Sequence, residues 1–544
     1  MKFKYIIPAV ASVAFLGLST SCVDDLDVTP IDPSTLMTPD YDALLNKCYA
    51  HLALSGQETS DGNIDIDDLD GGTSGLIRQL WNSQELTSDE AVCGWGDAGI
   101  DTYVSGLLNS EHPMLNGLYN RLYVAITTCN YYLQTASDYN ATYTAEVRAL
   151  RAYYYSILLD GWGGNVPFAT TISSDKPKQT NGPDLYAFIE EELLDAKADL
   201  LDAAVLNEND ANYGRINKAA ADMLLARLYL NAEVYTGTAQ WQKASDAAKR
   251  VIDLGVYNLS SKPSTAANGQ VYTGYQKLFM GDNGTNGATE EAIFSVKFEG
   301  SHMQTWGGAM FLMASTWDGD MKISDLIQSN NTSEAWGGNR ATSQLASMFS
   351  LTADNSAGLL TDAIINVAGD ERALFCSEGR KFSTTANLGD FKYGYGVTKY
   401  HNNTLAGTPG SHSQFPDIDI FVIRYAEALL TYAEAQFRLG NTAEALAQIQ
   451  ALQARANVKA TSNHRIAAIT DGHEILDEWC REFYFEGRRR TDLIRWGLYT
   501  GSAYLWEWKG GVANGTALAD SYKIFPIPAS DLNANSNLKQ NPGY

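Results

Sequence analysis

Apolar side chains recur every three or four positions over several long stretches of this chain, which is the spacing of a helix with one buried face. One such stretch covers residues 219–230, and a second covers 241–254 after a short polar break. Further stretches of this kind cover residues 119–135, 144–159 and 184–203. We therefore expect long amphipathic helices, several of them joined to the next by a short turn.

The sharpest helical pair lies in the C-terminal third of the chain. Its first helix covers residues 424–439 and ends before Gly440, a residue that easily adopts the left-handed conformation found at helix ends. We expect Asn441 to cap the next helix, which runs to about residue 456, with Glu444 completing a capping box. Helix–turn–helix pairs with alanine-rich faces resemble tetratricopeptide repeats.

Between the helical stretches lie long segments of a different composition. Residues 56–118, 258–345 and 355–420 are rich in Gly, Asn, Ser, Thr and Asp, and a short strand is expected at 292–296. Their tryptophans and tyrosines argue against disorder. The sequence predicts a mostly α fold, a tetratricopeptide-like scaffold of helical pairs with long irregular insertions and minor β structure. We expect residues 22–544 to form one domain, with functional insertions around 56–118 and 258–420.

The N-terminus has the order of a secretory signal. Lys2 and Lys4 precede an apolar stretch at residues 5–18, and small residues lead directly to Cys22. A cysteine at this place is what a bacterial lipoprotein signal peptidase requires, since the thiol is lipidated before cleavage. We expect residues 1–21 to be removed and Cys22 to carry a lipid anchor. An ordinary cleaved signal with an incidental cysteine is the alternative.

The overall charge narrows the classes of partner. The chain of 544 residues has a formal net charge of −25, and removing the signal takes away two lysines and no acid, which makes it −27. Such a chain repels phosphate backbones, so nucleic-acid binding is excluded. The five cysteines beyond Cys22 are scattered and form no CxxC pair, so we expect buried free thiols, with a single disulfide as the alternative.

Tryptophan usage gives the first functional hypothesis. Five of the 11 tryptophans are followed directly by glycine, and three of these five, Trp95, Trp306 and Trp336, lie in the polar insertions. A glycine beside an indole removes bulk, so that a ligand can lie flat on the ring. We interpret these three residues as a stacking platform for sugar rings, against the alternative of ordinary core packing. Trp162 and Trp496 follow helices instead.

Signatures of catalysis and metal binding are weak. The acidic stretch 61–70 fails the EF-hand pattern, because Ile66 and Gly72 occupy positions that require glycine and a bidentate acid. A solvated acidic loop is therefore favoured over a calcium site, and residues 282–284 with 290–291 are a looser calcium alternative. The chain has no HExxH, P-loop or GxSxG motif. We expect no cofactor and no enzymatic activity, and a helical glycosidase is the remaining enzymatic alternative.

Four long motifs, in order along the chain, carry a family resemblance. They cover residues 148–168, 423–435, 478–496 and 525–544. They resemble the SusD/RagB family of outer-membrane lipoproteins, whose members bind their ligand without cleaving it. Within these motifs, residues 486–488 are expected to form a buried charge network rather than a binding site. The acidic residues just after Cys22 are similar to the surface-export signal of such lipoproteins, which implies a location outside the cell.

The resemblance is closest to the starch-binding members of the family. It implies binding of starch or maltooligosaccharides and delivery to a SusC-like TonB-dependent transporter in the outer membrane. It also implies that Trp95, Trp306 and Trp336 stack on glucose units and that Arg78 bonds their hydroxyls. A sugar-binding asparagine of those members falls near Asp97, where the match fails. The alternatives are a family member that binds a different glycan or a peptide.

Overall fold

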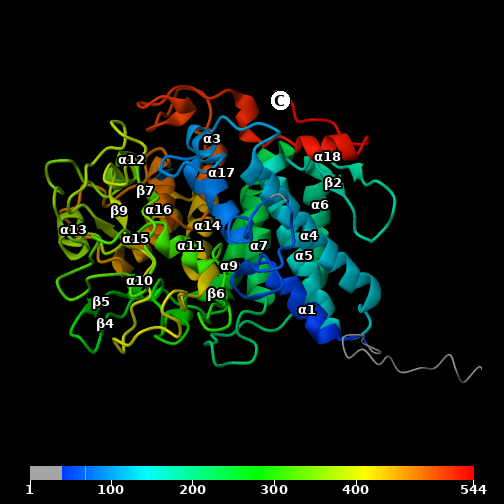
Figure 1. Ribbon diagram of the computed structural model, residues 1–544, viewed down its shortest axis with the longest axis horizontal. Coiled ribbons are helices and arrows are strands. Elements are labelled where there is room, and N and C mark those ends of the chain that lie inside the picture. The colour runs from blue at the N-terminus through cyan, green and yellow to red at the C-terminus, as the bar shows by residue number, and fades with distance from the viewer. Residues whose placement is uncertain (1–38, 68) are drawn as a thin grey trace, which may run out of the picture.

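The computed structural model describes residues 39–67 and 69–544. The predicted signal peptide and Cys22 lie outside these residues. Figure 1 shows long helices gathered on the right of the view and loops with short elements on the left. No helix in the described part of the chain is long and apolar enough to cross a membrane.

The helical part is built from long helices that pack in pairs. Neighbouring pairs in space are α4 with α5, α5 with α6, α7 with α9, α9 with α14, and α14 with α15. The bounds of these helices are α1 (Tyr41–Ala50), α4 (Pro113–Thr135), α5 (Ala141–Trp162), α6 (Gly182–Ala196), α7 (Lys218–Leu230), α9 (Trp241–Asp253), α14 (Tyr425–Arg438) and α15 (Thr442–Arg455). The scaffold of helical pairs predicted from the sequence is confirmed, although α6 ends earlier than the expected residue 203.

The turn between α14 and α15 confirms one local prediction and corrects another. Gly440 has a φ of +89°, as expected for a left-handed helix stop. The capping box is wrong, because Asn441 makes no side-chain cap and its Nδ2 instead donates to Gln436 Oε1 at 2.6 Å. That bond ties Asn441 back to the preceding helix.

Shorter elements make up the rest of the described chain. The remaining α-helices are α2 (Leu76–Trp81), α3 (Ile100–Ser105), α8 (Ala232–Thr236), α10 (Gly274–Lys277), α11 (Ala309–Ala314), α12 (Ser343–Met348), α13 (Thr361–Ala368), α16 (His473–Phe483), α17 (Arg489–Arg495) and α18 (Ala529–Ala534). A π-helical turn, η3 (Asn82–Leu86), follows α2 directly.

The strands form short antiparallel pairs. They are β1 (Ala91–Cys93) with β7 (Asn339–Ala341), β2 (Pro167–Phe168) with β3 (Lys178–Gln179), β4 (Ser264–Thr265) with β5 (Val271–Tyr272), β6 (Ala292–Val296) with β10 (Ile420–Arg424), and β8 (Phe375–Cys376) with β9 (Gly396–Val397). Two of these pairs, β1 with β7 and β6 with β10, join distant parts of the sequence. β6 has the bounds predicted from the sequence. The β1–β7 pair matters most for function, because it brings the first insertion against the second.

A single large cluster of buried apolar residues extends through the helical part and the insertions. A smaller cluster near the C-terminus surrounds Leu476 and Trp506. The five described cysteines are all buried, and their thiols are free.

Charged side chains from the C-terminal motifs are buried together behind the insertions. Arg424 donates to Glu291 at 2.8 Å and to Glu482 at 2.6 Å, and its other nitrogens contact Glu486. Burial alone would raise the pKa of Glu482, but the surrounding guanidiniums outweigh burial and hold this pKa well below its usual range. We call this group the buried charge network; its members are Glu291, Arg372, Arg424, Arg455, Glu478, Glu482 and Glu486. The prediction that residues 486–488 form a buried charge network is confirmed for Glu486. Arg488 pairs instead with Glu427 and Asp492, outside this group.

Candidate functional site

Trp95, Trp306 and Trp336 lie side by side, although the chain separates the first from the last by 241 positions. The ring centre of Trp336 is 6.2 Å from that of Trp95 and 6.2 Å from that of Trp306. The rings are tilted against one another by 53° and 39°, respectively, and all three are half-buried. We call these three residues the tryptophan row. Trp336 is its middle member.

The β1–β7 pair holds two members of the row together. Trp95 follows β1 and Trp336 precedes β7, and the Gly94 N–H donates to the Gly338 carbonyl at 3.2 Å. A Cβ on Gly338 would lie 2.2 Å from Cε2 of Trp95, so only glycine lets the backbone pass this close to the ring. The absence of a side chain at Gly338 is therefore needed for packing within the row. Gly96, beside Trp95, faces open space.

Trp306 is held by an acidic residue of the first insertion. The carboxylate of Asp61 accepts from the Trp306 N–H at 2.8 Å and from the Thr305 hydroxyl at 3.2 Å. Asp61 is buried, and the Ser55 hydroxyl donates to its other oxygen at 3.0 Å. The solvated acidic loop predicted for residues 61–70 is therefore wrong at Asp61, because this carboxylate anchors the Trp306 backbone.

Two other positions weighed as calcium ligands also have structural contacts. Asp65 forms a 2.8 Å ion pair with the buried Arg121. The Asn283 amide donates to the carbonyls of Leu278 and Asp419, both at 2.8 Å. Across residues 39–67 and 69–544, His, Cys, Asp and Glu side chains do not gather in groups of three or more that could hold a metal ion.

Arg78 lies beside the row with its guanidinium among aromatic rings. Its Cζ is 5.7 Å from the ring centre of Trp95 and 5.1 Å from that of Phe311. The residue is only 8% exposed, and its Nε has no hydrogen-bond partner among the described residues. Burial lowers the pKa of Arg78, an effect opposed by the negative charges of Asp70 and Asp97. A buried donor of this kind is well suited to an incoming acceptor.

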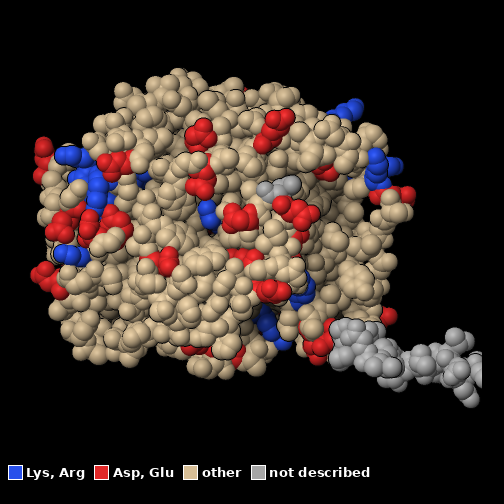
Figure 2. Space-filling model, viewed as in Figure 1, with Lys and Arg blue, Asp and Glu red and all other residues tan. Residues whose placement is uncertain are grey.

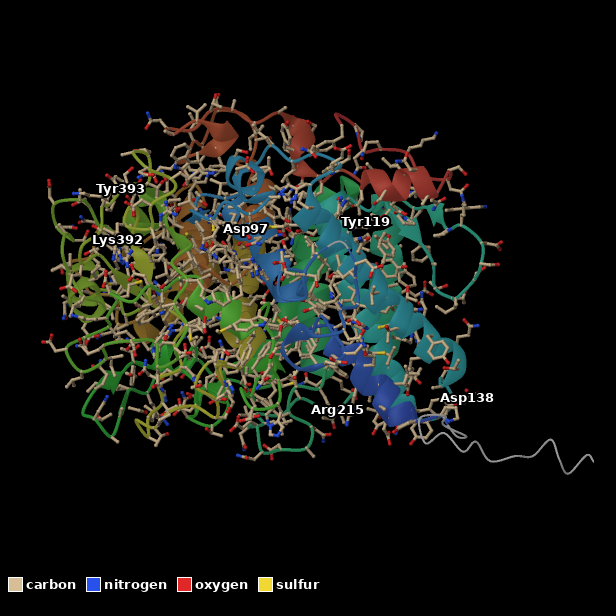
Figure 3. All side chains as sticks on the ribbon, viewed as in Figure 1. Asp97, Tyr119, Asp138, Arg215, Lys392 and Tyr393 are labelled. Carbon is tan, nitrogen blue, oxygen red and sulfur yellow. The ribbon has the colours of Figure 1, made fainter. Side chains whose placement is uncertain are left out.

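Asp97 is exposed and follows Trp95 by two positions. Figure 3 places it between the helical part on the right and the loops that carry Lys392 and Tyr393 on the left. Its backbone carbonyl accepts from Ile100 N–H at the start of α3. The structure thus brings Asp97 to the same neighbourhood as Arg78 and Trp95, with its carboxylate open to solvent.

Sequence reasoning missed several residues that surround the row. The ring centre of Phe311 in α11 lies 6.4 Å from that of Trp95, and the ring centre of Phe415 lies 4.7 Å from that of Trp306. Glu334 accepts from the Trp336 Nε1–H at 2.8 Å. None of these belongs to a Trp-Gly pair, so the signal that singled out the row could not find them. The one local signal for such a residue was that Glu334 is acidic and stands two positions before Trp336.

The two remaining Trp-Gly pairs serve packing. Trp162 is fully buried against Phe525, and its Nε1–H donates to the Pro526 carbonyl at 2.8 Å. Trp496 lies flat beside Phe437, with the Arg438 guanidinium 4.3 Å from its ring centre. Trp162 ends α5 and Trp496 follows α17, as expected from the sequence. The assignment of the three insertion tryptophans to a ligand stays a prediction.

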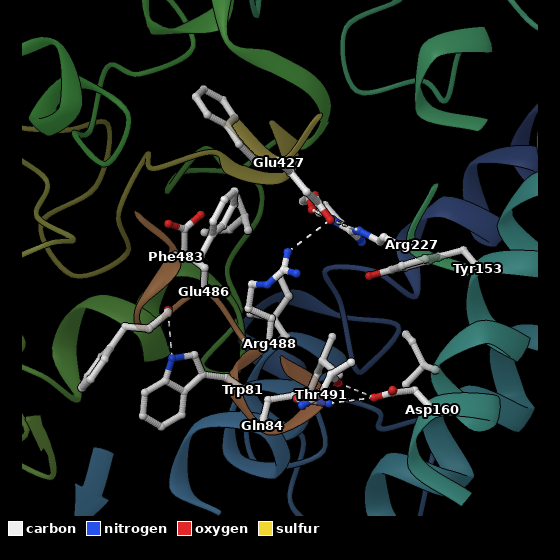
Figure 4. A pocket seen from close by; sticks show the side chains of 18 of the residues that line it. Trp81, Gln84, Tyr153, Asp160, Arg227, Glu427, Phe483, Glu486, Arg488 and Thr491 are labelled. Carbon is white, nitrogen blue, oxygen red and sulfur yellow. Dashed lines mark hydrogen bonds and ion pairs between the residues drawn. The ribbon is translucent and has the colours of Figure 1, made fainter. Parts of the chain in front are cut away.

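A separate cavity of about 210 Å³ lies between α5 and α7 on one side and α2, η3 and β10 on the other (Figure 4). Its charged side chains already have partners within the protein. Glu427 accepts from Arg227 and from Arg488, and Asp160 accepts from the Thr491 hydroxyl at 2.6 Å. The cavity therefore presents an apolar wall whose charged side chains are already bonded within the protein, and the tryptophan row remains the stronger candidate for a sugar site.

The face of the molecule drawn in Figure 2 carries acidic side chains spread across it and fewer basic ones. Lys392 near its left edge pairs with Asp318 at 2.8 Å and with Asp320 at 2.9 Å. A surface of this kind disfavours anionic polymers and leaves neutral ligands such as glycans unaffected.

Comparison with known proteins agrees with the motifs in the sequence. The model of the SusD family matches residues 377–544. The chain is 36% identical to the starch-binding protein SusD of Bacteroides thetaiotaomicron over 582 aligned positions, which cover 100% of both proteins.

Solved structures agree on the fold. A SusD superfamily protein from Parabacteroides distasonis matches with a TM-score of 0.64 at 20% identity, covering 93% of this chain and 98% of that one. Surface glycan-binding protein A from Bacteroides thetaiotaomicron, solved in complex with laminarihexaose, matches with a TM-score of 0.63 at 20% identity, covering 92% and 98%. The full-length match to a curated relative decides the identification. This chain belongs to the SusD family.

Proposed function

We propose that this protein binds starch and related α-glucans at the cell surface without cleaving them. The observation that carries the proposal is the tryptophan row, three half-buried indoles whose neighbouring ring centres lie 6.2 Å apart and which the fold brings together from three loops. The curated relative with 36% identity is a starch-binding protein, and it aligns over its whole length.

The geometry of the row suits a curved sugar chain. The flat C–H faces of glucose units pack against indole faces, and tilts of 53° and 39° between neighbouring rings make a bent rather than a flat surface. Chains of α-linked glucose curve in solution, so successive units can meet successive rings. Arg78 would donate to sugar hydroxyls and Asp97 would accept from them.

Two acidic side chains that contact the row already have structural partners. Asp61 accepts from the Trp306 backbone, and Glu334 accepts from the Trp336 indole. Glycoside hydrolysis needs a free acid and a free carboxylate on opposite sides of the scissile bond. The engagement of both residues supports a binding role, in line with the family.

For location and partners we propose a lipid anchor at Cys22 that holds the protein on the outer face of the outer membrane. There it would pass bound glycan to a SusC-like TonB-dependent transporter. These proposals rest on the N-terminal sequence and on membership of the family. We propose that binding needs no cofactor.

Calorimetric titration of the protein from residue 23 onward tests this function, with maltoheptaose and α-cyclodextrin as ligands and laminarihexaose as the β-linked control. We expect Kd values between about 1 μM and 1 mM for the α-glucans, or about −8 to −4 kcal/mol. Addition of EDTA should leave these values unchanged. No heat with either α-glucan would contradict the proposal, and release of reducing sugar during incubation would contradict its non-catalytic part.

A further inference from the structure

A short segment outside the tryptophan row connects two of its members. We call residues 411–417 the linking segment. Its Ser413 carbonyl accepts from the Ser333 N–H at 2.9 Å, three positions before Trp336. Its Asp417 carboxylate accepts from the Gly300 N–H at 2.8 Å, in the loop that leads to Trp306. One segment therefore holds both loops.

Two side chains of the linking segment reach the row directly or through one intermediate. Phe415 is 3% exposed and packs against Trp306 with ring centres 4.7 Å apart. Gln414 Nε2 donates to Glu334 Oε1 at 2.7 Å, and the other oxygen of Glu334 accepts from Trp336 Nε1–H at 2.8 Å. The middle indole of the row is therefore fixed by a chain of two hydrogen bonds that starts in the linking segment.

From these contacts we infer that Glu334 and Gln414 are positioning residues that set the orientation of the Trp336 indole, and with it the curvature of the ligand that the row accepts. The statement about ligand curvature rests on the proposed function. The statement about the indole rests on the contacts alone.

Glu334 and Gln414 act on the orientation of Trp336 through its indole N–H. Because that N–H bonds Glu334, it is not offered to a sugar hydroxyl, and Trp336 presents its ring face only. An indole held at one edge keeps a fixed angle to both neighbours, 53° to Trp95 and 39° to Trp306. Without Glu334, rotation about the side-chain bonds of Trp336 would be opposed by ring packing alone.

A rigid ligand should respond to this control more than a flexible one. A cyclodextrin has a fixed curvature and cannot follow a rotated indole. A linear maltoheptaose can adjust its own torsions and recover most of the contact. Losing the two hydrogen bonds should therefore change the ratio of affinities for the two ligands as well as their absolute values.

The test compares the parent protein with Glu334→Ala, Gln414→Ala and Glu334→Gln. We expect Glu334→Ala to weaken α-cyclodextrin binding by about tenfold and maltoheptaose binding by no more than about threefold. Gln414→Ala should give a smaller change in the same direction. Glu334→Gln should restore the parent ratio, because its amide oxygen can accept from Trp336 while Gln414 flips to accept from its amide nitrogen. An unchanged ratio, or equal losses on both ligands, would overturn the inference about curvature.

A measurement without ligand separates this inference from the proposed function. The crystal structure of ligand-free Glu334→Ala should show the Trp336 indole turned from its parent orientation or in more than one conformer, with the rest of the fold unchanged. The indole in its parent orientation with a single conformer would overturn the positioning role. Failure of the parent protein to bind any α-glucan would instead contradict the proposed function and leave this structural result standing.

Discussion

The tryptophan row and the buried charge network are built in the same way but differ in how the buried arginine of each region is paired. Both collect side chains from segments far apart in the sequence, and in both a guanidinium is removed from water. In the network, Arg424 meets three carboxylates and is fully buried. Beside the row, Arg78 is 8% exposed, lies against the rings of Trp95 and Phe311, and leaves its Nε without a partner in the described part of the chain.

The difference indicates what each region is for. A buried arginine that is fully paired holds together the segments that supply its partners, because its loss would leave buried charges uncompensated, and no donor is left for a ligand. A buried donor that lacks a partner costs free energy until an acceptor arrives. The network therefore holds distant segments of the fold together, and Arg78 beside the row keeps a hydrogen-bond donor available for a ligand.

Breaking the network should have the largest effect, and on stability alone. Arg424→Met leaves Glu291, Glu482 and Glu486 with fewer positive partners in a buried place, so the free energy of unfolding should fall by about 3–5 kcal/mol. Urea denaturation measures this change. The Kd for maltoheptaose of the protein that remains folded should equal that of the parent. A stability loss below about 1 kcal/mol would contradict the assignment.

Breaking the row should give the converse result. Trp306→Ala removes a half-buried indole from one end of the row and should weaken maltoheptaose binding by about thirtyfold or more, or about 2 kcal/mol. Its matched control is Trp496→Ala, which alters another half-buried Trp-Gly pair, away from the row. Calorimetry should show an unchanged Kd for the control. Equal losses in both variants would remove the distinction between the two kinds of tryptophan.

Acid should weaken the packed body of the protein through its buried histidines. Burial lowers the pKa of His401 to about 3, whereas an unfolded histidine titrates near 6.5. Between these values the unfolded chain binds a proton that the folded chain does not. The contribution of His401 is thus fully present above pH 6.5 and is lost, by about 1.4 kcal/mol for each pH unit, as the pH falls toward 3.

His401→Phe tests this effect while keeping a ring stacked on Tyr272. Unfolding free energies from pH 7 to pH 4 should fall less steeply in the variant than in the parent. His51 and His112, whose pKa values burial lowers to about 3 and about 4, will retain part of the slope. An identical slope in parent and variant would show that His401 does not contribute.

Periodicity was sufficient for helices such as α9, which buries one face of its own sequence. The helices α7 and α14 are buried on nearly all sides, and their long apolar stretches indicated them instead. The apolar pattern also identified β6, whose five residues are all buried. The family motifs then identified the overall fold. Local pattern failed at Asn441, because the residue that it bonds, Gln436, belongs to the preceding helix.

The row itself could be predicted, and its supports could not. Trp95, Trp306 and Trp336 share a local signal, a glycine directly after the indole in a polar loop. Asp61 acts across 245 positions, and Gln414 acts across 80 positions on Glu334. Such contacts depend on how three loops fold over one another, which no spacing within a single loop records.

A crystal structure of the protein soaked with maltoheptaose would show where the sugar binds. We expect successive glucose units with their faces against Trp95, Trp336 and Trp306, and a sugar hydroxyl within hydrogen-bonding distance of Arg78. Sugar bound elsewhere, for example in the cavity between α5 and α2, with the row left empty, would contradict this expectation.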